Sequence, residues 1–286
     1  MAPVIQSFFD TATHTVTYLV HDPASRQAAV IDPVLDFDPK AARLSTGSAD
    51  RVLAAVRDQR LNLTYVLETH AHADHLSAAD HIRRATGAKI VIGADIRVVQ
   101  RGFGALFEAD DVSPDGSEFD RLVEEGETLP LGELNFGVMH TPGHTPACVT
   151  YLIGDAAFVG DTLFMPDYGT ARADFPGGHA ATLYRSIRRI LALPPETRIF
   201  VGHDYLPEGR DTHAWETTVA EERAGNRHVR DGIDEAQFVA MRQARDATLD
   251  APTLILPSLQ VNIRAGALPP ASQQGRVFLR LPVNAI

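Results

Sequence analysis

The chain has 286 residues, of which 44% are hydrophobic, so it is long and apolar enough to bury a substantial core. Its formal net charge of −11 argues against binding to nucleic acid or to an anionic membrane face, because both require a basic footprint. Cys148 is the only cysteine, which excludes an intrachain disulfide and any mechanism with an attacking and a resolving cysteine in one chain.

The first half of the chain alternates β-rich runs with helical patterns. Asp22-Pro23 is a turn signal between two such runs and predicts an opening hairpin. Gly87 is expected to end a helix that begins at Asp74. The expected elements are strands over 15–21 and 27–32, a helix over 48–59, a strand over 63–67, a helix over 74–86 and a strand over 89–92.

The second half begins with a loop over 110–116 and continues with closely spaced strands. Gly154-Asp155 marks the hairpin between two of them. The expected elements are strands over 134–139, 148–153 and 156–159, a helix over 181–191, a strand over 198–201 and a mostly helical segment over 217–249, followed by an irregular tail. Strands that feed helices predict an α/β fold with sheets flanked by helices.

Histidines and a carboxylate cluster directly after the apolar run 63–67. The segment Thr69-His70-Ala71-His72-Ala73-Asp74-His75 holds three imidazoles and one carboxylate within six positions. Side chains two apart at a strand end point the same way, so His70 and His72 can face one cavity. Imidazole and carboxylate are natural ligands of Zn(II), Fe(II) or Mn(II), and the cluster therefore predicts a metal site.

Three later segments repeat this placement of a metal-ligand residue after an apolar strand. His144 follows a tight Pro-Gly turn in Thr141-Pro142-Gly143-His144-Thr145, Asp161 lies in Gly160-Asp161-Thr162, and His203 lies in Val201-Gly202-His203-Asp204. One such placement is weak evidence, but four in one chain strongly indicate one shared site.

The series His-x-His-x-Asp-His, Gly-His-Thr, Gly-Asp and Gly-His resembles the metal-binding motifs of the metallo-β-lactamase superfamily. Within it the chain resembles the persulfide dioxygenases, also called sulfur dioxygenases, over roughly residues 5 to 265. The further segments that carry this likeness are Cys148-Val149-Thr150-Tyr151, Arg172 within 169–175, Gly202-His203-Asp204-Tyr205 and Glu221-Glu222-Arg223. The resemblance implies an αββα sandwich, two mixed β-sheets flanked by helices.

The resemblance also implies a ligand set. One Fe(II) per chain would be held by His70, His144 and Asp161, a facial triad that leaves open positions for O₂ and substrate. The remaining motif residues, His72, Asp74, His75 and His203, would orient the ligands and bound water. All seven residues of a dinuclear site are present, so Zn(II) and a second metal stay open.

The implied reaction is oxidation of glutathione persulfide by O₂ to sulfite and glutathione. Tyr205 can hydrogen-bond an iron-bound ligand or be a half-buried loop residue. Arg172 can pair with a glutathione carboxylate, or form an ion pair with the nearby Asp174. Cys148 lies in a predicted strand, where a packing role is favoured over a chemical one.

Rival readings remain. The nearest is a dinuclear Zn(II) thioester hydrolase resembling glyoxalase II, in which a metal-bound hydroxide attacks the thioester. Others are a non-catalytic metal-binding sensor or partner module, and a β-lactamase, which the lack of a signal peptide disfavours. We expect one domain over 1–286, with a helical and irregular extension from about residue 217. We also expect a cytoplasmic homodimer. No membrane span is expected, because no apolar run approaches the roughly 18–20 residues that a membrane helix requires.

Overall fold

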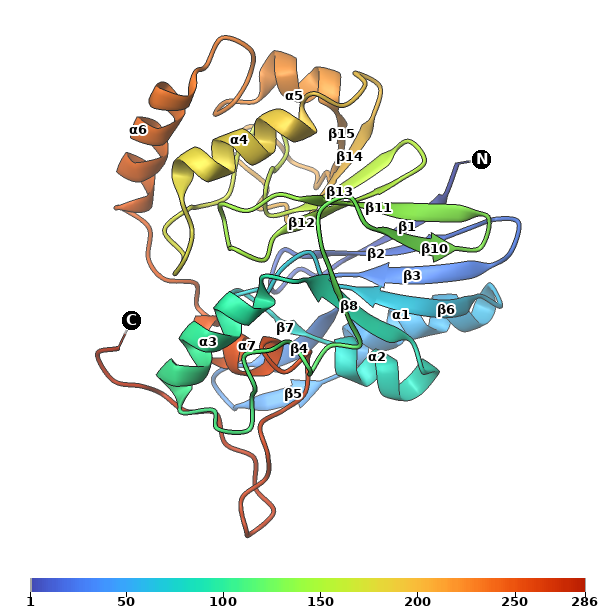
Figure 1. Ribbon diagram of the computed structural model, residues 1–286, viewed down its shortest axis with the longest axis vertical. Helices are drawn as coiled ribbons and strands as arrows, with labels where there is room; N and C mark the ends of the chain where they lie inside the picture. Colours follow the sequence, from blue (N-terminus) through green and yellow to red (C-terminus); the bar gives the residue numbers. More distant parts are fainter. Residues whose placement is uncertain (1, 286) are drawn as a thin grey trace.

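Two β-sheets face each other in the middle of the molecule, and helices cover their outer faces (Figure 1). The computed structural model describes residues 2–285. Each large sheet has six strands and mixes parallel with antiparallel pairs. This arrangement confirms the predicted αββα sandwich of two mixed sheets.

The first sheet is built from the N-terminal half of the chain in the order β1-β2-β3-β6-β8-β9. Pairs β1–β2 and β2–β3 are antiparallel, whereas β3–β6, β6–β8 and β8–β9 are parallel. The strands are β1 (Val4–Phe9), β2 (Val16–His21), β3 (Gln27–Ile31), β6 (Asn62–Leu67), β8 (Lys89–Gly93) and β9 (Arg121–Val123). The predicted opening hairpin is the β2–β3 pair.

The second sheet follows the chain order β10-β11-β12-β13-β14-β15. Only β13–β14 is parallel among its pairs in the described residues. The strands are β10 (Thr128–Leu131), β11 (Leu134–His140), β12 (Val149–Ile153), β13 (Ala156–Gly160), β14 (Arg198–Val201) and β15 (Glu216–Thr218). Gly154, at φ 60°, forms the predicted turn between β12 and β13.

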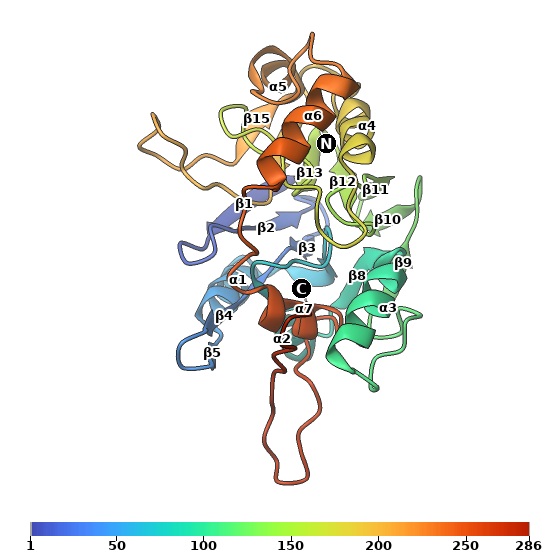
Figure 2. The ribbon, with the colours of Figure 1, turned by 90° about the vertical axis from the view of Figure 1, so that its left-hand side faces the viewer.

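Three apolar layers hold the sandwich together. Tyr18, Val91 and Phe136 belong to the layer between the sheets. A second layer lies under α1 (Gly47–Asp58), α2 (Ala79–Thr86), α3 (Ile96–Phe107) and α7 (Ile255–Asn262), and a third lies under α4 (Ala180–Ile190), α5 (Val219–Gly225) and α6 (Glu235–Asp246) (Figure 2). The C-terminal helix α7 therefore returns to the half of the molecule built by the N-terminal residues.

The helix predicted to start at Asp74 begins five residues later. Residues Leu76–Ser77 form β7, which pairs with β4 (Val34–Asp38) in a small third sheet completed by β5 (Arg43–Ser45). The Ser77 hydroxyl accepts a hydrogen bond from the Ala79 backbone N–H at 3.0 Å, at the point where α2 begins. Pairing of Leu76–Ser77 with β4 thus explains why α2 does not begin at Asp74.

Several elements were not predicted. The structure adds strands β1, β4, β5, β7, β9, β10 and β15 and helices α3 and α7. Helix α7 lies within the segment expected to be an irregular tail. The late helical segment is divided into α5 and α6 by residues 226–234. Among residues 2–285, no helix combines the length and apolar character needed to cross a membrane.

Candidate metal centre

All seven predicted site residues converge where strands of the two sheets end. The loop after β6, which we call the metal loop, supplies His70, His72, Asp74 and His75. The second sheet supplies His144 before β12, Asp161 after β13 and His203 after β14. Six of these side chains are buried, and Asp74 is partly exposed. Their ligand atoms form two adjoining groups.

The first group, which we call the triad, consists of His70, His144 and Asp161. Asp161 Oδ2 lies 4.0 Å from His70 Nε2 and 3.8 Å from His144 Nε2. All three ligand atoms lie within 4.8 Å of one another. Two imidazole nitrogens and one carboxylate oxygen at this spacing are a set that one transition-metal ion can bind.

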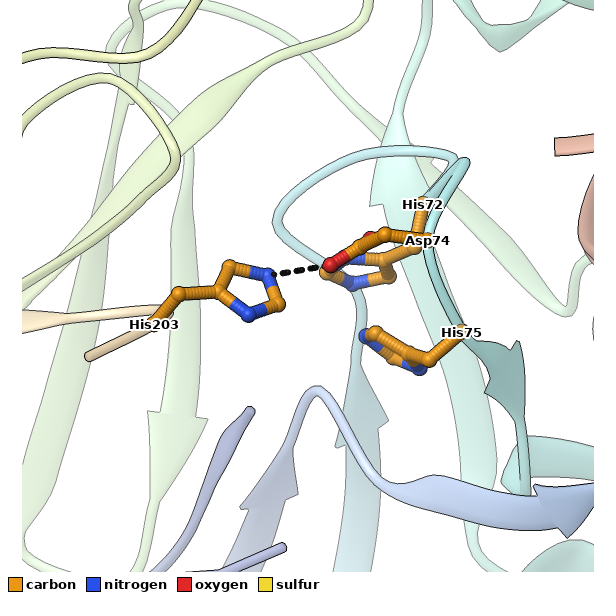
Figure 3. A group of neighbouring side chains, drawn as sticks. All are labelled: His72, Asp74, His75 and His203. Atoms are coloured by element: carbon orange, nitrogen blue, oxygen red, sulfur yellow. Dashed lines mark ion pairs between the residues drawn. The ribbon is translucent and has the colours of Figure 1, made fainter. Parts of the chain in front are cut away.

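The second group, the four-residue set, consists of His72, Asp74, His75 and His203 (Figure 3). His203 Nε2 lies 3.2 Å from Asp74 Oδ2 and 3.3 Å from Asp161 Oδ1. The Asp161 carboxylate therefore has one oxygen toward the triad and the other toward the four-residue set.

The histidine rings are fixed through one nitrogen and present the other to the centre. His144 Nδ1 donates to the Arg172 carbonyl at 2.8 Å, and His75 Nδ1 donates to the Leu76 carbonyl at 3.2 Å. Since a carbonyl only accepts, both rings carry their proton on Nδ1. The Nε2 atoms of His70, His75 and His203 have no hydrogen-bond partner within residues 2–285. Buried acceptors left unpaired and facing one another fit a bound cation.

Burial favours the neutral form of the His70 and His75 rings. Burial, together with the neighbouring imidazoles, lowers the pKa of His70 well below its usual range. Burial and His72 lower the pKa of His75 to about 3. A neutral ring keeps its Nε2 lone pair free at physiological pH, which metal binding requires.

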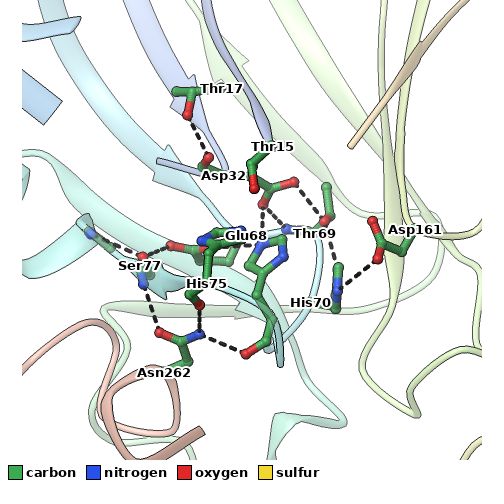
Figure 4. Close-up of polar contacts among 12 residues, drawn as sticks. Thr15, Thr17, Asp32, Glu68, Thr69, His70, His75, Ser77, Asp161 and Asn262 are labelled. Carbon is green, nitrogen blue, oxygen red and sulfur yellow. Dashed lines mark hydrogen bonds and ion pairs between the residues drawn. The ribbon is translucent and has the colours of Figure 1, made fainter. Parts of the chain in front are cut away.

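A buried network behind the metal loop was missed by the sequence prediction (Figure 4). Asp32, directly after β3, accepts from the Thr69 backbone N–H at 2.7 Å and from Thr69 Oγ1 at 2.8 Å. Thr69 Oγ1 in turn lies 3.0 Å from His70 Nδ1. His72 Nε2 lies 3.0 Å from Asp32 and 3.4 Å from Glu68. Supporting carboxylates of this kind fix the ring orientation of metal ligands.

Gly160 allows the two halves of the site to approach closely. Its φ is +51°, and a Cβ there would lie 2.4 Å from Thr69 Oγ1. A larger residue would displace the hydroxyl that contacts His70. The positive φ and the close approach of Thr69 therefore explain why glycine occupies the first position of the Gly-Asp motif.

A cavity of about 490 Å³ opens beside the triad. Tyr205 lines it and stacks on His203, with ring centroids 5.5 Å apart and planes inclined by 12°. Burial, with Asp74 and Asp161 nearby, raises the pKa of Tyr205 well above its usual range. Its hydroxyl therefore stays protonated and can donate a hydrogen bond into the cavity.

Three arginines also line the cavity, and they differ in their partners. Arg172 forms a two-point ion pair with Asp174, at 2.6 and 2.8 Å, and donates to the Asp250 carbonyl at 2.7 Å. Arg242 is buried and pairs with Asp246 at 2.7 Å. Within residues 2–285, no carboxylate lies within 4.0 Å of the Arg245 guanidinium. Arg245 is therefore the cavity arginine whose charge is free for a ligand.

Cys148 lies just before β12 and is buried, with 2% of its surface exposed. Its sulfur is 3.1 Å from Thr145 Oγ1. Burial raises the pKa of the Cys148 thiol to about 12, so the reactive thiolate is scarce at neutral pH. These contacts favour the packing role predicted for it.

Comparison with known proteins places this geometry in a family. The profile of the Metallo-beta-lactamase superfamily matches residues 10–203. A Burkholderia pseudomallei protein named "Probable metallo-hydrolase" is 53% identical over 99% of both chains. "Glyoxylase B2" of Dictyostelium discoideum is 43% identical over 98% of this chain and 97% of its own. The chain spans 65% of the length of a beta-lactamase hydrolase-like protein of Xylella fastidiosa, to which it is 49% identical.

Persulfide dioxygenases are also among the similar proteins. The human mitochondrial persulfide dioxygenase ETHE1 is 31% identical over 95% of this chain and 92% of its own. The crystal structure of ETHE1 from Myxococcus xanthus superposes with a TM-score of 0.74 at 34% identity, over 92% of this chain and 100% of that one. The chain therefore belongs to the metallo-β-lactamase superfamily, as a homologue of its persulfide dioxygenases.

Proposed function

We propose that the chain is a non-haem Fe(II) persulfide dioxygenase that oxidises glutathione persulfide with O₂ and one water molecule to sulfite and glutathione. The observation that carries this proposal is the triad, because two imidazoles and one carboxylate converge as a separate group beside an open cavity. A 2-His-1-carboxylate set that leaves coordination positions open is typical of Fe(II) oxygenases. Homology to persulfide dioxygenases supports the same reaction.

In this proposal His70, His144 and Asp161 hold one Fe(II), which supplies the redox chemistry that joins O₂ to sulfur. Asp74 and His203 are close enough to the triad to hold or move a proton at the bound substrate. His72 and His75 orient the metal loop, and Tyr205 donates a hydrogen bond from the cavity wall.

The substrate part of the proposal rests on the arginines of the cavity. Glutathione has two carboxylates remote from its sulfur, and guanidinium groups match carboxylates in shape and charge. Arg172 keeps its proposed substrate role, although its guanidinium already pairs with Asp174. We add Arg245 as the anchor for a glutathione carboxylate, because it lines the cavity without an acidic partner among the described residues.

One experiment tests the metal and the reaction together. The protein is purified anaerobically without added metal, its metals are measured by elemental analysis, and O₂ uptake is followed with glutathione persulfide. We expect about one iron per chain and persulfide-dependent O₂ uptake with sulfite as product. Two zinc ions per chain without O₂ uptake would refute the proposal.

The four-residue set supports a second candidate, a dinuclear Zn(II) hydrolase of glutathione thioesters. It adjoins the triad through Asp161 and can hold a second ion. The 43% identity to a protein named Glyoxylase B2 agrees with it. Hydrolysis of S-lactoylglutathione by the zinc-loaded protein, measured beside O₂ uptake, separates the two candidates.

The arginine roles are tested by steady-state kinetics of Arg245→Ala and Arg172→Ala, with Arg57→Ala as a control. Arg57 lies exposed on α1 and does not line the cavity. We expect Arg245→Ala to raise KM for glutathione persulfide about 5–30-fold with little change in kcat, because a remote anchor contributes binding shared by ground and transition states. A small persulfide without carboxylates should be insensitive. An equal loss with both substrates would contradict the anchor.

Assembly and location also remain proposals. We propose a homodimer that works in the cytoplasm, and light scattering during size-exclusion chromatography measures its mass. A mass of one chain would refute the dimer.

A further inference from the structure

Asn262, the last residue of α7, contacts the metal loop from the C-terminal part of the chain (Figure 4). Its side chain is buried, with 4% exposed. Asn262 Nδ2 donates to the backbone carbonyls of His72 and His75, both at 2.8 Å, and Oδ1 accepts from the Ser77 backbone N–H at 2.8 Å. These groups lie at least 185 positions earlier in the sequence.

The chemistry of these contacts requires a carboxamide. Carbonyls only accept and a backbone N–H only donates, so the orientation of the amide is fixed by its partners. Aspartate has the same shape but lacks both donors, and alanine lacks all three contacts. The two carbonyls belong to residues that flank Ala73 and Asp74, so the amide bridges both sides of the segment that carries the four-residue set.

Other contacts hold Asn262 in place. Arg264 forms a two-point ion pair with Asp111, both contacts at 2.7 Å, and Gln100 of α3 donates to the Ile263 carbonyl at 3.0 Å. Leu259 and Val261 of α7 are fully buried in the layer under the first sheet. The end of α7 is thus a rigid support, as a part that positions metal ligands must be.

A second network joins this amide to His72. Ser77, whose N–H Asn262 accepts, donates its hydroxyl to Glu68, and Glu68 lies 3.4 Å from His72 Nε2. Asn262 therefore contacts the metal loop in two ways. It binds two backbone carbonyls of the loop directly, and it is linked to the His72 imidazole through Ser77 and Glu68.

We propose that Asn262 is a positioning residue of the metal centre, and that docking of α7 and binding of metal stabilise each other through it. A metal ion that binds more tightly to the ordered metal loop favours the state in which α7 is packed against that loop. By the same coupling, packing of α7 raises the affinity of the loop for metal. The inference rests on the metal site of the proposed function but does not depend on which reaction that site performs.

The test compares Asn262→Ala and Asn262→Asp with Gln260→Ala. Gln260 is an ideal control because it is also a buried amide of α7, with contacts of 2.9 and 3.0 Å to the Leu256 and Arg280 carbonyls and none to the metal loop. Co(II) is titrated into metal-free protein, and its affinity and visible absorption spectrum are recorded. We expect both Asn262 variants to bind Co(II) about 10–100-fold more weakly with an altered spectrum, and Gln260→Ala to stay within about twofold of wild type.

A second measurement needs no variant and so does not depend on the mutants folding. Hydrogen exchange of the wild-type protein is compared with and without Zn(II). We expect the metal to slow exchange in residues 255–266 as well as in the metal loop, and to leave exchange in β10, at the edge of the second sheet, unchanged. Unchanged exchange in α7, or equal Co(II) affinity of the Asn262 variants and wild type, would overturn the inference. A protein that binds Co(II) with this coupling but oxidises no persulfide would refute the proposed function alone.

Discussion

Glu222 of α5 is a buried carboxyl whose protonation should control stability. It is fully buried, its Oε2 accepts from Asn226 Nδ2 at 2.7 Å, and its Oε1 has no hydrogen-bond partner within residues 2–285. Burial, with Glu221 and Asp167 adding negative charge, raises the pKa of Glu222 from 4.5 to about 8. The perturbation is Glu222→Gln, which keeps the shape and removes the titration.

The direction of the effect follows from proton binding. Between pH 4.5 and 8 the unfolded chain has released the Glu222 proton while the folded protein retains it. The folded state then binds more protons, so the free energy of unfolding falls as pH rises through this window and levels off above it. The stability contributed by the protonated carboxyl is fully present below pH 4.5 and lost by about pH 8.

The magnitude follows from the same interval. At roughly 1.36 kcal/mol per pH unit, the window from 4.5 to 8 corresponds to about 5 kcal/mol. About 3.5 kcal/mol of this falls between pH 5 and pH 8, because the carboxyl titrates only partly near each end of the window. Glutamine does not titrate. The variant should therefore gain about 3.5 kcal/mol relative to wild type over that range, or roughly 7–10 °C in Tm.

The assay is urea unfolding of metal-free wild type and Glu222→Gln at pH 5, 6, 7 and 8. Metal is removed because its affinity has a pH dependence of its own. Glu196→Gln, at an exposed glutamate of the turn before β14, is the matched control and should show the wild-type pH profile. A stability difference between Glu222→Gln and wild type that stays constant within about 0.5 kcal/mol from pH 5 to pH 8 would show that Glu222 is ionised when folded, and the burial argument would fail.

Three further predictions concern the site. Alanine at any residue of the triad should abolish iron binding and O₂ uptake, and near-normal iron content in Asp161→Ala by elemental analysis would disprove the assignment. His72→Ala and His203→Ala should keep much of the iron but lose about 10–100-fold in affinity or activity, whereas complete metal loss in His72→Ala would indicate a different ligand set. Cys148→Ser should keep most of its turnover at a modest cost in thermal stability, and a folded, iron-loaded but inactive variant would show that the thiol has a chemical role.

The candidate metal ligands could be proposed from the sequence because each one follows an apolar strand. His144, Asp161 and His203 come after β11, β13 and β14, and strand ends on one side of a sheet meet in space. Local signals also located most strands and the helices α1 and α4. Helix α3 had an available signal that was overlooked, since its buried Ile96, Val99, Phe103 and Phe107 have helical spacing.

The supporting residues had no comparable local signal. Asp32 follows β3 just as Asp161 follows β13, but its segment, Ile31-Asp32-Pro33, matches none of the motifs from which the metal site was predicted. Asn262 lies in a helix within the segment predicted to be an irregular tail, and its hydrogen-bond partners are nearly two hundred positions away. Contacts of this kind are determined by how α7 returns to the first sheet. Spacing within one segment therefore cannot predict them.

Backbone pairing between the two halves of the site leads us to expect that loss of a metal ligand by mutation will not unfold the protein. The Val149 N–H donates to the Thr69 carbonyl at 2.9 Å, and the Val16 N–H donates to the Gly202 carbonyl at 2.8 Å. The first bond joins the segments that carry His70 and His144, and the second joins the segment that carries His203 to β2 of the first sheet. Neither bond involves a ligand side chain. The approach of the two ligand sets is thus fixed by the backbone before metal binds. Loss of a ligand should remove the ion and its chemistry, while the apolar layers and the strand pairing remain.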